Sequence, residues 1–317
     1  MNDVAVRILG FFSAVILLIL ATIASGMCSY SQPPRVSIDG SSTLFPINEA
    51  IAEDFSLGRR VQVRVGISGT GGGMEKFCRG EIDIAAASRK IKESERQACA
   101  ARGISDIVEF DVAIDALTVL VSRQNTWAQC MTVDELSRAF RAGGATRWNQ
   151  LRPEWPDEAI HFYHPGSDSG TFDYFTEAVI EATDKTLTHR ADGNASEDDN
   201  IIAVGVAHDR NGLAYLGFAY YQESGNDVRA VAIDDGNGCI EPTRETATSG
   251  QYTPLSRRLF YYLRESTLRE NETLVEMLQY GYANIVRITD ETGYIELPPE
   301  AVQEQEAKLT QIIAGGT

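Results

Sequence analysis

The chain has 317 residues, 43% of them hydrophobic and 23% charged, so it is long enough for two globular domains or one large one. Its formal net charge of −17 argues against nucleic acid as a partner, because no basic stripe is available to displace counterions from phosphates. Any anionic ligand must therefore be held by local dipoles and hydrogen-bond donors, since the field of the whole molecule repels it.

The N-terminus carries an export signal. Arg7 precedes an apolar run from Ile8 to Ala24, after which small residues follow. Such a segment is typical of a signal peptide or of an uncleaved membrane anchor, and we assign residues 1–32 to it. The sequence before Cys28 is similar to a lipoprotein cleavage box, although Met27 is bulkier than the residue expected there, so lipidation of this cysteine stays open.

The other four cysteines are candidates for disulfides, because an exported chain folds in an oxidising environment. They are Cys78, Cys99, Cys130 and Cys239, and they allow three pairings. Joining Cys78 to Cys99 is the most economical choice because it closes a short local loop, and it leaves Cys130 with Cys239. A metal site is the alternative, but the chain has no CxxC motif and its four histidines show no ligand spacing.

Three segments in the first third of the chain share one pattern, in which a short strand leads through a turn of small or hydroxyl residues into a helix. The turns hold Ser42 and Thr43, then Thr70 in a glycine-rich stretch, then Ser88 and Arg89. Glycines at a turn let backbone amides approach a ligand. The strands are expected at 35–38, 61–65 and 82–87, and the helices at 47–55, at 74–78 and from residue 93 onward.

Arg89 has two interpretations. A lone arginine commonly pairs with a surface carboxylate, but this one stands at a strand end beside hydroxyl-bearing turns. A guanidinium offers a fixed fork of donors that matches tetrahedral oxyanions, so a ligand role is equally open.

The middle and the end of the chain alternate strands with helices. Residues 110–116 lead to a buried strand expected over 117–121, near which the chain crosses between domains, and Thr132 with Glu135 predicts a capped helix over 131–142. The later elements are helices at 172–182 and from residue 201, strands at 213–221 and 228–233, a strand crossing back over 252–262, a helix at 270–284 and a solvated helix after Pro299.

The central stretch from His164 to Phe172 repeats the strand, turn and helix pattern. Ser169, Gly170 and Thr171 fall at the start of the helix. The first amides of a helix lack internal partners, so these residues form either an anion site or an ordinary N-cap. Four such turns gathered at the carboxyl ends of strands would surround one small anion with neutral donors.

Six motifs in this order resemble the periplasmic phosphate-binding proteins of phosphate ABC importers, the PstS family, and its SphX-like branch most of all. The resemblance covers roughly residues 35–297 and implies an α/β fold of the type II periplasmic binding protein class, with a ligand cleft between two lobes. Lobe I is expected over 33–115 and 248–298, lobe II over 116–247, and a solvated tail over 299–317. The motifs are Asp39–Pro46, Gly69–Gly73, Asp83–Lys90, Ser167–Phe175, Ala195–Asn200 and Tyr252–Arg257.

The resemblance also implies a ligand set. Two departures matter, because well-known family members have a carboxylate where Ser88 stands and an arginine where Pro165 stands. We therefore expect Arg89 to supply the missing cation, and Asp168 or Glu197 to accept the proton of the ligand. The residues expected to contact phosphate are Ser42, Thr43, Leu44 through its amide, Thr70, Ser88, Arg89, Ser169, Gly170 through its amide and Thr171. Family disulfides would support the pairs Cys78–Cys99 and Cys130–Cys239.

The function implied by the resemblance is capture of inorganic phosphate and its delivery to the permease of an ABC transporter in the inner membrane. The chain is expected to be monomeric, periplasmic or held on the outer face of that membrane, and to need neither cofactor nor metal. The alternatives are a binding protein for sulfate or molybdate and an exported phosphatase. Against the enzyme, Ser169 has no assigned histidine as a base, and no metal-ligand cluster is present to activate water.

Overall fold

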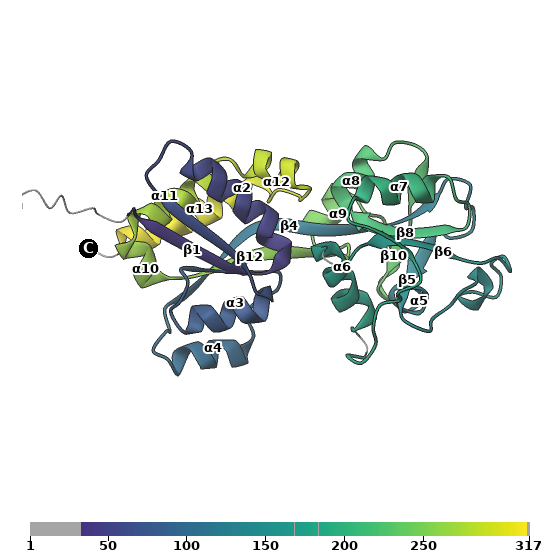
Figure 1. Cartoon of the computed structure of the whole chain (residues 1–317), viewed down its shortest axis with the longest axis horizontal. Coiled ribbons are helices and arrows are strands. Elements are labelled where there is room, and N and C mark those ends of the chain that lie inside the picture. The colour runs from purple at the N-terminus through teal and green to yellow at the C-terminus, as the bar shows by residue number, and fades with distance from the viewer. Residues whose placement is uncertain (1–32, 168, 183, 316–317) are drawn as a thin grey trace, which may run out of the picture. The chain divides into compact units, whose positions relative to one another are not determined.

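Two long strands cross the molecule and join its two halves. In the computed structural model, β4 (Ile107–Ser122) pairs antiparallel with β12 (Ser256–Arg264) over its first part, and from Leu117 onward it pairs with β8 (Gly212–Gly217). The expected crossing segments are therefore strands, although the second one starts at Ser256 rather than at 252. Nine of the described strands form one continuous sheet through this connection (Figure 1).

The structure describes residues 33–167, 169–182 and 184–315. The expected export segment 1–32 with Cys28, and Asp168, lie outside the described residues. Within the described part, no helix combines the length and the apolar character needed to cross a membrane.

The first half of the sheet is parallel, with the order β2–β1–β3. Because these strands are parallel, their carboxyl ends meet at one edge. One face packs on α2 (Phe45–Ser56) and on helices from the end of the chain, and the other on α3 (Gly69–Cys78) and α4 (Glu93–Ala100) (Figure 1). The strands are β1 (Arg35–Gly40), β2 (Gln62–Ile67) and β3 (Ile84–Ala87), and the late helices are α10 (Glu265–Glu270), α11 (Glu272–Ala283), α12 (Ile285–Thr292) and α13 (Pro299–Ala314).

Helix α3 begins at Gly69, five residues before the expected start at Met74. The glycine-rich stretch is thus the first turns of a helix rather than an open loop. A Cβ atom on Gly73 would lie 2.6 Å from the Cα atom of Gly40, so glycine is what lets this helix approach β1 so closely. Glycine has a low helix propensity, and for that reason the sequence pattern alone did not predict helix here.

The second half of the sheet contains β6 (His161–Pro165) between β8 and β7 (Asn194–Ser196), with all three strands parallel. Its core includes Phe140, Phe175 and Tyr215, and the last two rings are stacked with centroids 3.9 Å apart. The covering elements are α5 (Val133–Phe140), α6 (Gly170–Phe175), the π-helical turn η3 (Thr176–Ile180), α7 (Asp199–Ala207), α8 (Phe218–Glu223) and α9 (Arg244–Thr248).

The predictions of two strands in this half, over 213–221 and 228–233, were wrong in part. Residues 218–221 begin α8, because β8 ends at Gly217. Residues 228–233 form two short strands, β9 (Val228–Ala230) on β4 and β10 (Ala232–Asp234) on β5 (Cys130–Thr132). An apolar run reveals neither where a strand gives way to a helix nor where it changes its partner strand.

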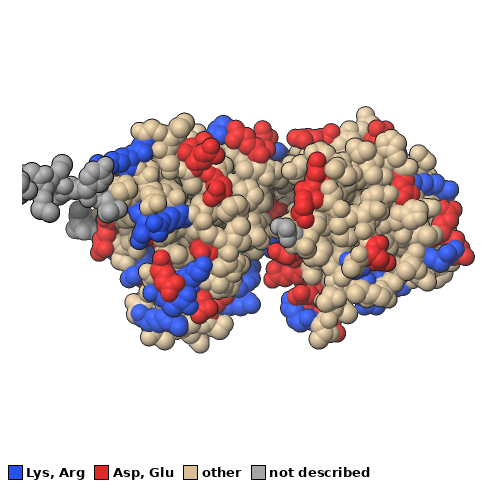
Figure 2. All heavy atoms as spheres, in the orientation of Figure 1, with Lys and Arg blue, Asp and Glu red and all other residues tan. Residues whose placement is uncertain are grey.

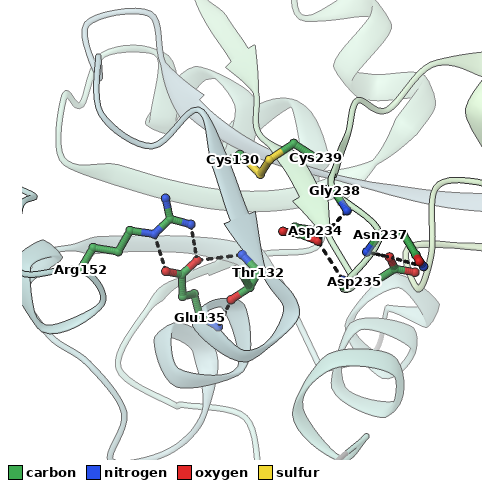
Figure 3. The surroundings of a disulfide bond; sticks show 10 residues. Cys130, Thr132, Glu135, Arg152, Asp234, Asp235, Asn237, Gly238 and Cys239 are labelled. Carbon is green, nitrogen blue, oxygen red and sulfur yellow. Dashed lines mark hydrogen bonds and ion pairs between the residues drawn. A yellow bond between two sulfur atoms is a disulfide. The ribbon is translucent and has the colours of Figure 1, made fainter.

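Both expected disulfides are present, which removes the metal interpretation of these cysteines. Cys78–Cys99 joins α3 to α4, and Cys130–Cys239 joins β5 to β11 (Cys239–Ile240). Figure 3 shows the second bond beside the start of α5, where Thr132 and Glu135 form the predicted capping box. Arg152 donates two hydrogen bonds to the same Glu135 carboxylate and so fixes this helix start.

The tail helix α13 is not solvated on all sides, contrary to expectation. Leu309 and Ile312 are buried in the core that covers the first half of the sheet. Its many glutamates suggested a free helix, but Gln305, Leu309 and Ile312, at three- to four-residue spacing, form one buried face.

Two neighbouring buried histidines, one of them at the start of the central stretch, should make the stability of the fold depend on pH. His164 and His189 have ring centroids 4.6 Å apart, and burial lowers the pKa of both, for His189 to about 4. The fold therefore favours neutral rings, whereas an unfolded histidine takes up a proton near pH 6.5. The contribution is complete above about pH 6.5 and is lost as the pH falls toward 4.

We expect His189→Gln to reduce the loss of stability between pH 7.5 and pH 4.5 by about 2 kcal/mol relative to wild type. Urea unfolding at the two pH values measures it, and titrating carboxylates cancel in the comparison of the two proteins. An unchanged pH dependence would show that the His189 ring is solvated in the native state.

Candidate functional site

A pocket of about 300 Å³ lies at the edge where the parallel strands of the first half of the sheet end. Its lining residues come from the three hydroxyl-bearing turns, from α6 and η3, and from the start of β12. Five of the nine predicted ligand residues line it, namely Ser42, Thr43, Thr70, Ser88 and Arg89. The other lining residues are Ser41, Gly69, Gly71, Lys92, Asp173, Tyr174, Glu177 and Arg257.

The first turn is set by Gly40. Its φ of 143° lies in a region open to glycine, and a Cβ atom there would stand 2.1 Å from the carbonyl oxygen of Ala86. The chain then enters a short 3₁₀ helix, η1 (Ser42–Leu44), in which Ser41 Oγ accepts a hydrogen bond from the Thr43 amide at 3.2 Å. The amide of Leu44 donates to the Ser41 carbonyl at 3.2 Å, so it is already engaged in this structure.

The second and third turns bring two predicted hydroxyls together. The hydroxyl oxygens of Thr70 and Ser88 are 3.2 Å apart, and the Ser88 amide donates to Thr70 Oγ1 at 3.2 Å. Beneath them, the Asp39 carboxylate accepts hydrogen bonds from Ser68 at 2.6 Å and from Lys76 at 2.5 Å. Burial opposes ionisation of Asp39, but these two donors outweigh it and hold the pKa of the carboxyl below its ordinary value. The carboxylate thus anchors the turn that presents Thr70.

The central stretch reaches the site through Gly170. A Cβ atom on this glycine would lie 3.2 Å from the Cα atom of Thr43, so the two turns are in direct contact. Ser169 Oγ accepts a hydrogen bond from the Thr171 amide at 3.2 Å, which confirms the N-cap interpretation of Ser169. Ser169, Gly170 and Thr171 do not line the pocket as described, and their ligand role stays a prediction.

Arg89 lines the pocket, but it is paired with the carboxylate of Glu95. Its two terminal nitrogens donate to the Glu95 carboxylate at 2.8 and 2.9 Å. This bidentate bond raises the pKa of Arg89 and lowers the pKa of Glu95 against the effect of its burial. The pairing with a carboxylate, one of the two interpretations left open by the sequence, is the one observed.

Arg257 is the pocket cation that the sequence did not single out. Its guanidinium lies over the ring of Tyr174, with Cζ 3.5 Å from the centroid, and its side chain is 14% exposed. Nη2 donates to Thr43 Oγ1 at 2.9 Å, and Nε donates to Asp115 Oδ2 at 3.2 Å. Burial raises the pKa of the Asp115 carboxyl even though Arg257 stabilises its charge. The one signal in the sequence was that Arg257 closes the last of the six motifs.

Two carboxylates face the pocket, and neither was predicted. Asp173 accepts a long hydrogen bond of 3.4 Å from Ser42 Oγ, and Glu177 Oε2 lies 3.8 Å from Arg257 Nη1. Desolvation by the pocket wall raises the pKa of Asp173. They stand four and eight residues after Ser169, a helical spacing that puts both on the face of that turn. Of the predicted proton acceptors, Glu197 packs against Gly166 and is not a pocket residue, and Asp168 lies outside the described residues.

The pocket carries hydrogen-bond donors and positive charges that could hold an anion. Its lining offers hydroxyl donors, the guanidinium groups of Arg89 and Arg257 and the ammonium group of Lys92 but, among the described residues, no histidine that could serve as a base. The part of the chain that the structure describes has no group of three acidic, histidine or cysteine residues placed to hold a metal ion. Figure 2 shows both acidic and basic side chains on this face, and the net charge of −17 means that the donors of the pocket act against an unfavourable general field.

Comparison with known proteins agrees with this geometry. Residues 29–280 match the model of the PBP superfamily domain. The protein SphX of Synechocystis is 44% identical over 279 residues, which are 86% of this chain and 82% of that protein. The phosphate-binding protein PstS of Staphylococcus saprophyticus is 34% identical over 281 residues, which are 88% of this chain and 85% of that protein.

A solved structure extends the likeness to three dimensions. It is described as that of a possible phosphate binding protein from Planctomyces limnophilus, and it is 41% identical with a TM-score of 0.84. The match covers 89% of this chain and 100% of that one. The two-lobed fold expected from the motifs is thus confirmed, and the chain belongs to the PBP superfamily and, within it, to the PstS family of phosphate-binding proteins, on its SphX-like branch.

Proposed function

We propose that this chain binds inorganic phosphate between its lobes and presents it to the permease of an ABC transporter. The observation that carries the proposal is Arg257, which lies over Tyr174, donates to Thr43 and lines a pocket rich in hydroxyl groups. A planar fork of donors among hydroxyls suits a tetrahedral oxyanion. The family membership supports phosphate as that oxyanion.

The crossing strands give the site its mechanism. Residues from both lobes line the pocket, and the two halves are joined through β4 and β12. Bending at these strands would close the cleft and bring Ser169, Gly170 and Thr171 onto a ligand that already touches Thr43, Thr70 and Ser88. We place lobe I at 33–115 and 248–298 and lobe II at 116–247. Closure of this kind gives a permease a way to recognise the loaded protein.

The same proposal extends to the compartment and the oligomeric state of the protein. We infer that the chain acts outside the cytoplasm as a monomer, held by residues 1–32 or released after their cleavage. Its two disulfides suit an oxidising compartment. We further propose that the chain is not an enzyme, because the pocket pairs no nucleophile with a base among the described residues.

Selectivity for phosphate requires a group that can accept the proton of the ligand, and we assign this role to Asp173. A carboxylate can approach an oxyanion only when a proton lies between them, and sulfate carries no such proton at neutral pH. We expect Asp173→Asn to weaken phosphate binding about tenfold, because the charged acceptor of the ligand's proton is lost. Sulfate binding should be equal or tighter, because the new amide can donate a hydrogen bond to this anion. Calorimetric titration of both anions into wild type and variant measures the ratio. An unchanged ratio would assign the proton to another acceptor.

The proposed function as a whole is tested with the purified chain after exchange of any bound anion. Phosphate, arsenate, sulfate and molybdate are titrated in turn, and a phosphate ester is tested for turnover. We expect one site per chain that takes phosphate and arsenate, with no turnover. Binding of sulfate or molybdate alone would support the alternative oxyanion carrier, and hydrolysis of the ester would support the phosphatase.

A further inference from the structure

The guanidinium of Arg257 has one nitrogen left for a ligand. Nε and Nη2 are both held by Asp115 Oδ2 at 3.2 Å, and Nη2 also donates to Thr43. Within the part of the chain that the structure describes, Nη1 has no hydrogen-bond acceptor. The group that stands opposite it is the Glu177 carboxylate, whose Oε2 is 3.8 Å away.

Glu177 is placed to move in and out of this position. It lies in η3, which follows α6 along the chain, and its side chain is 54% exposed, whereas that of Arg257 is 14% exposed. It lines both the ligand pocket and the adjoining hollow beside Thr253 and Pro254. Its side chain can therefore face Arg257 or turn into the adjoining hollow without leaving solvent, at little cost in free energy.

We propose that Glu177 sets the affinity of the site by competing with the bound oxyanion for Nη1 of Arg257. The inference rests on the proposed function, since it concerns the same pocket. With the pocket empty, the Glu177 carboxylate is the charged group that faces Nη1, while Asp115 pairs with the other two nitrogens. An arriving oxyanion must displace Glu177, and afterwards the displaced charge repels the ligand. Because the competition concerns charge alone, it should weaken the binding of phosphate and sulfate by the same factor, in contrast to the role assigned to Asp173.

The test measures phosphate affinity by calorimetric titration of the full chain, freed of anion, for wild type, Glu177→Gln and Glu181→Gln. Glu181 is the matched control, because it lies four residues further on, pairs with Lys185 at 3.4 Å and does not line the pocket. We expect Glu177→Gln to tighten phosphate binding about tenfold, and any measurable sulfate binding by the same factor. Glu181→Gln removes the same charge from the molecule and should change the affinity less than twofold.

A double-mutant cycle shows whether the effect passes through Arg257. In the Arg257→Gln background, the gain from Glu177→Gln should fall below twofold, because no guanidinium remains to compete for. A tenfold gain that persists there, an equal gain in the Glu181→Gln control, or no gain at all would overturn the proposal. If wild type itself takes up no phosphate, the proposed function fails, and this inference fails with it.

Discussion

Arg257→Gln should weaken phosphate binding by about 100-fold or more. A hydrogen bond to a charged group contributes about 1.5–3 kcal/mol, and each 1.4 kcal/mol is a factor of ten in affinity. The substitution removes the bond expected from Nη1 and also the donor that orients Thr43 Oγ1. Titration of wild type and variant with phosphate measures the loss.

Two controls make this result specific. Arg89→Gln removes a pocket charge that Glu95 already neutralises, and we expect it to cost less than about fivefold in affinity. Arg257→Gln also leaves Asp115 buried without its partner, so the double variant Asp115→Asn/Arg257→Gln separates misfolding from lost binding. A large loss with Arg89→Gln and a small loss with Arg257→Gln would return the cation role to Arg89, where the sequence had placed it.

The second large effect concerns stability. Replacing Cys130 and Cys239 with serine should lower the free energy of unfolding by about 4–5 kcal/mol, because the bond closes a loop of 109 residues in the unfolded chain. Urea unfolding of the oxidised wild type and of the double variant measures the difference.

The other disulfide is the internal comparison. Cys78–Cys99 closes 21 residues, for which the same relation gives about 3 kcal/mol. The variant without the Cys130–Cys239 bond should therefore be less stable than a variant in which Cys78 and Cys99 are replaced with serine. The reverse order would mean that native packing, rather than restriction of the unfolded chain, decides the contribution of each bond.

Much of the fold could be predicted because its signals are local. The alternation of residues 61–65 gave β2 nearly to its ends, and the Thr132–Glu135 pair gave the start of α5. The hydroxyl turns were recognised because each follows a short strand, and parallel strands bring their carboxyl ends to one edge. Four of these turn hydroxyls do line one pocket.

The charged groups of the site could not be predicted in the same way, because their neighbours are distant in sequence. Arg257 and Thr43 are 214 residues apart, and Ser42 and Asp173 are 131 apart. The choice of Arg89 as the cation rested on its place at a strand end, which the structure confirms, but Glu95 six residues away occupies its donors. Only the folded chain shows which carboxylate each arginine meets.

The central claim, that one oxyanion is held by hydroxyls and Arg257 between the lobes, is tested most directly by a crystal structure of the chain grown with phosphate. We predict one phosphate with oxygens within hydrogen-bond distance of Thr43, Thr70, Ser88 and Arg257 Nη1, and with Glu177 turned away. An anion bound elsewhere, or a pocket that stays empty at saturating phosphate, would contradict the account.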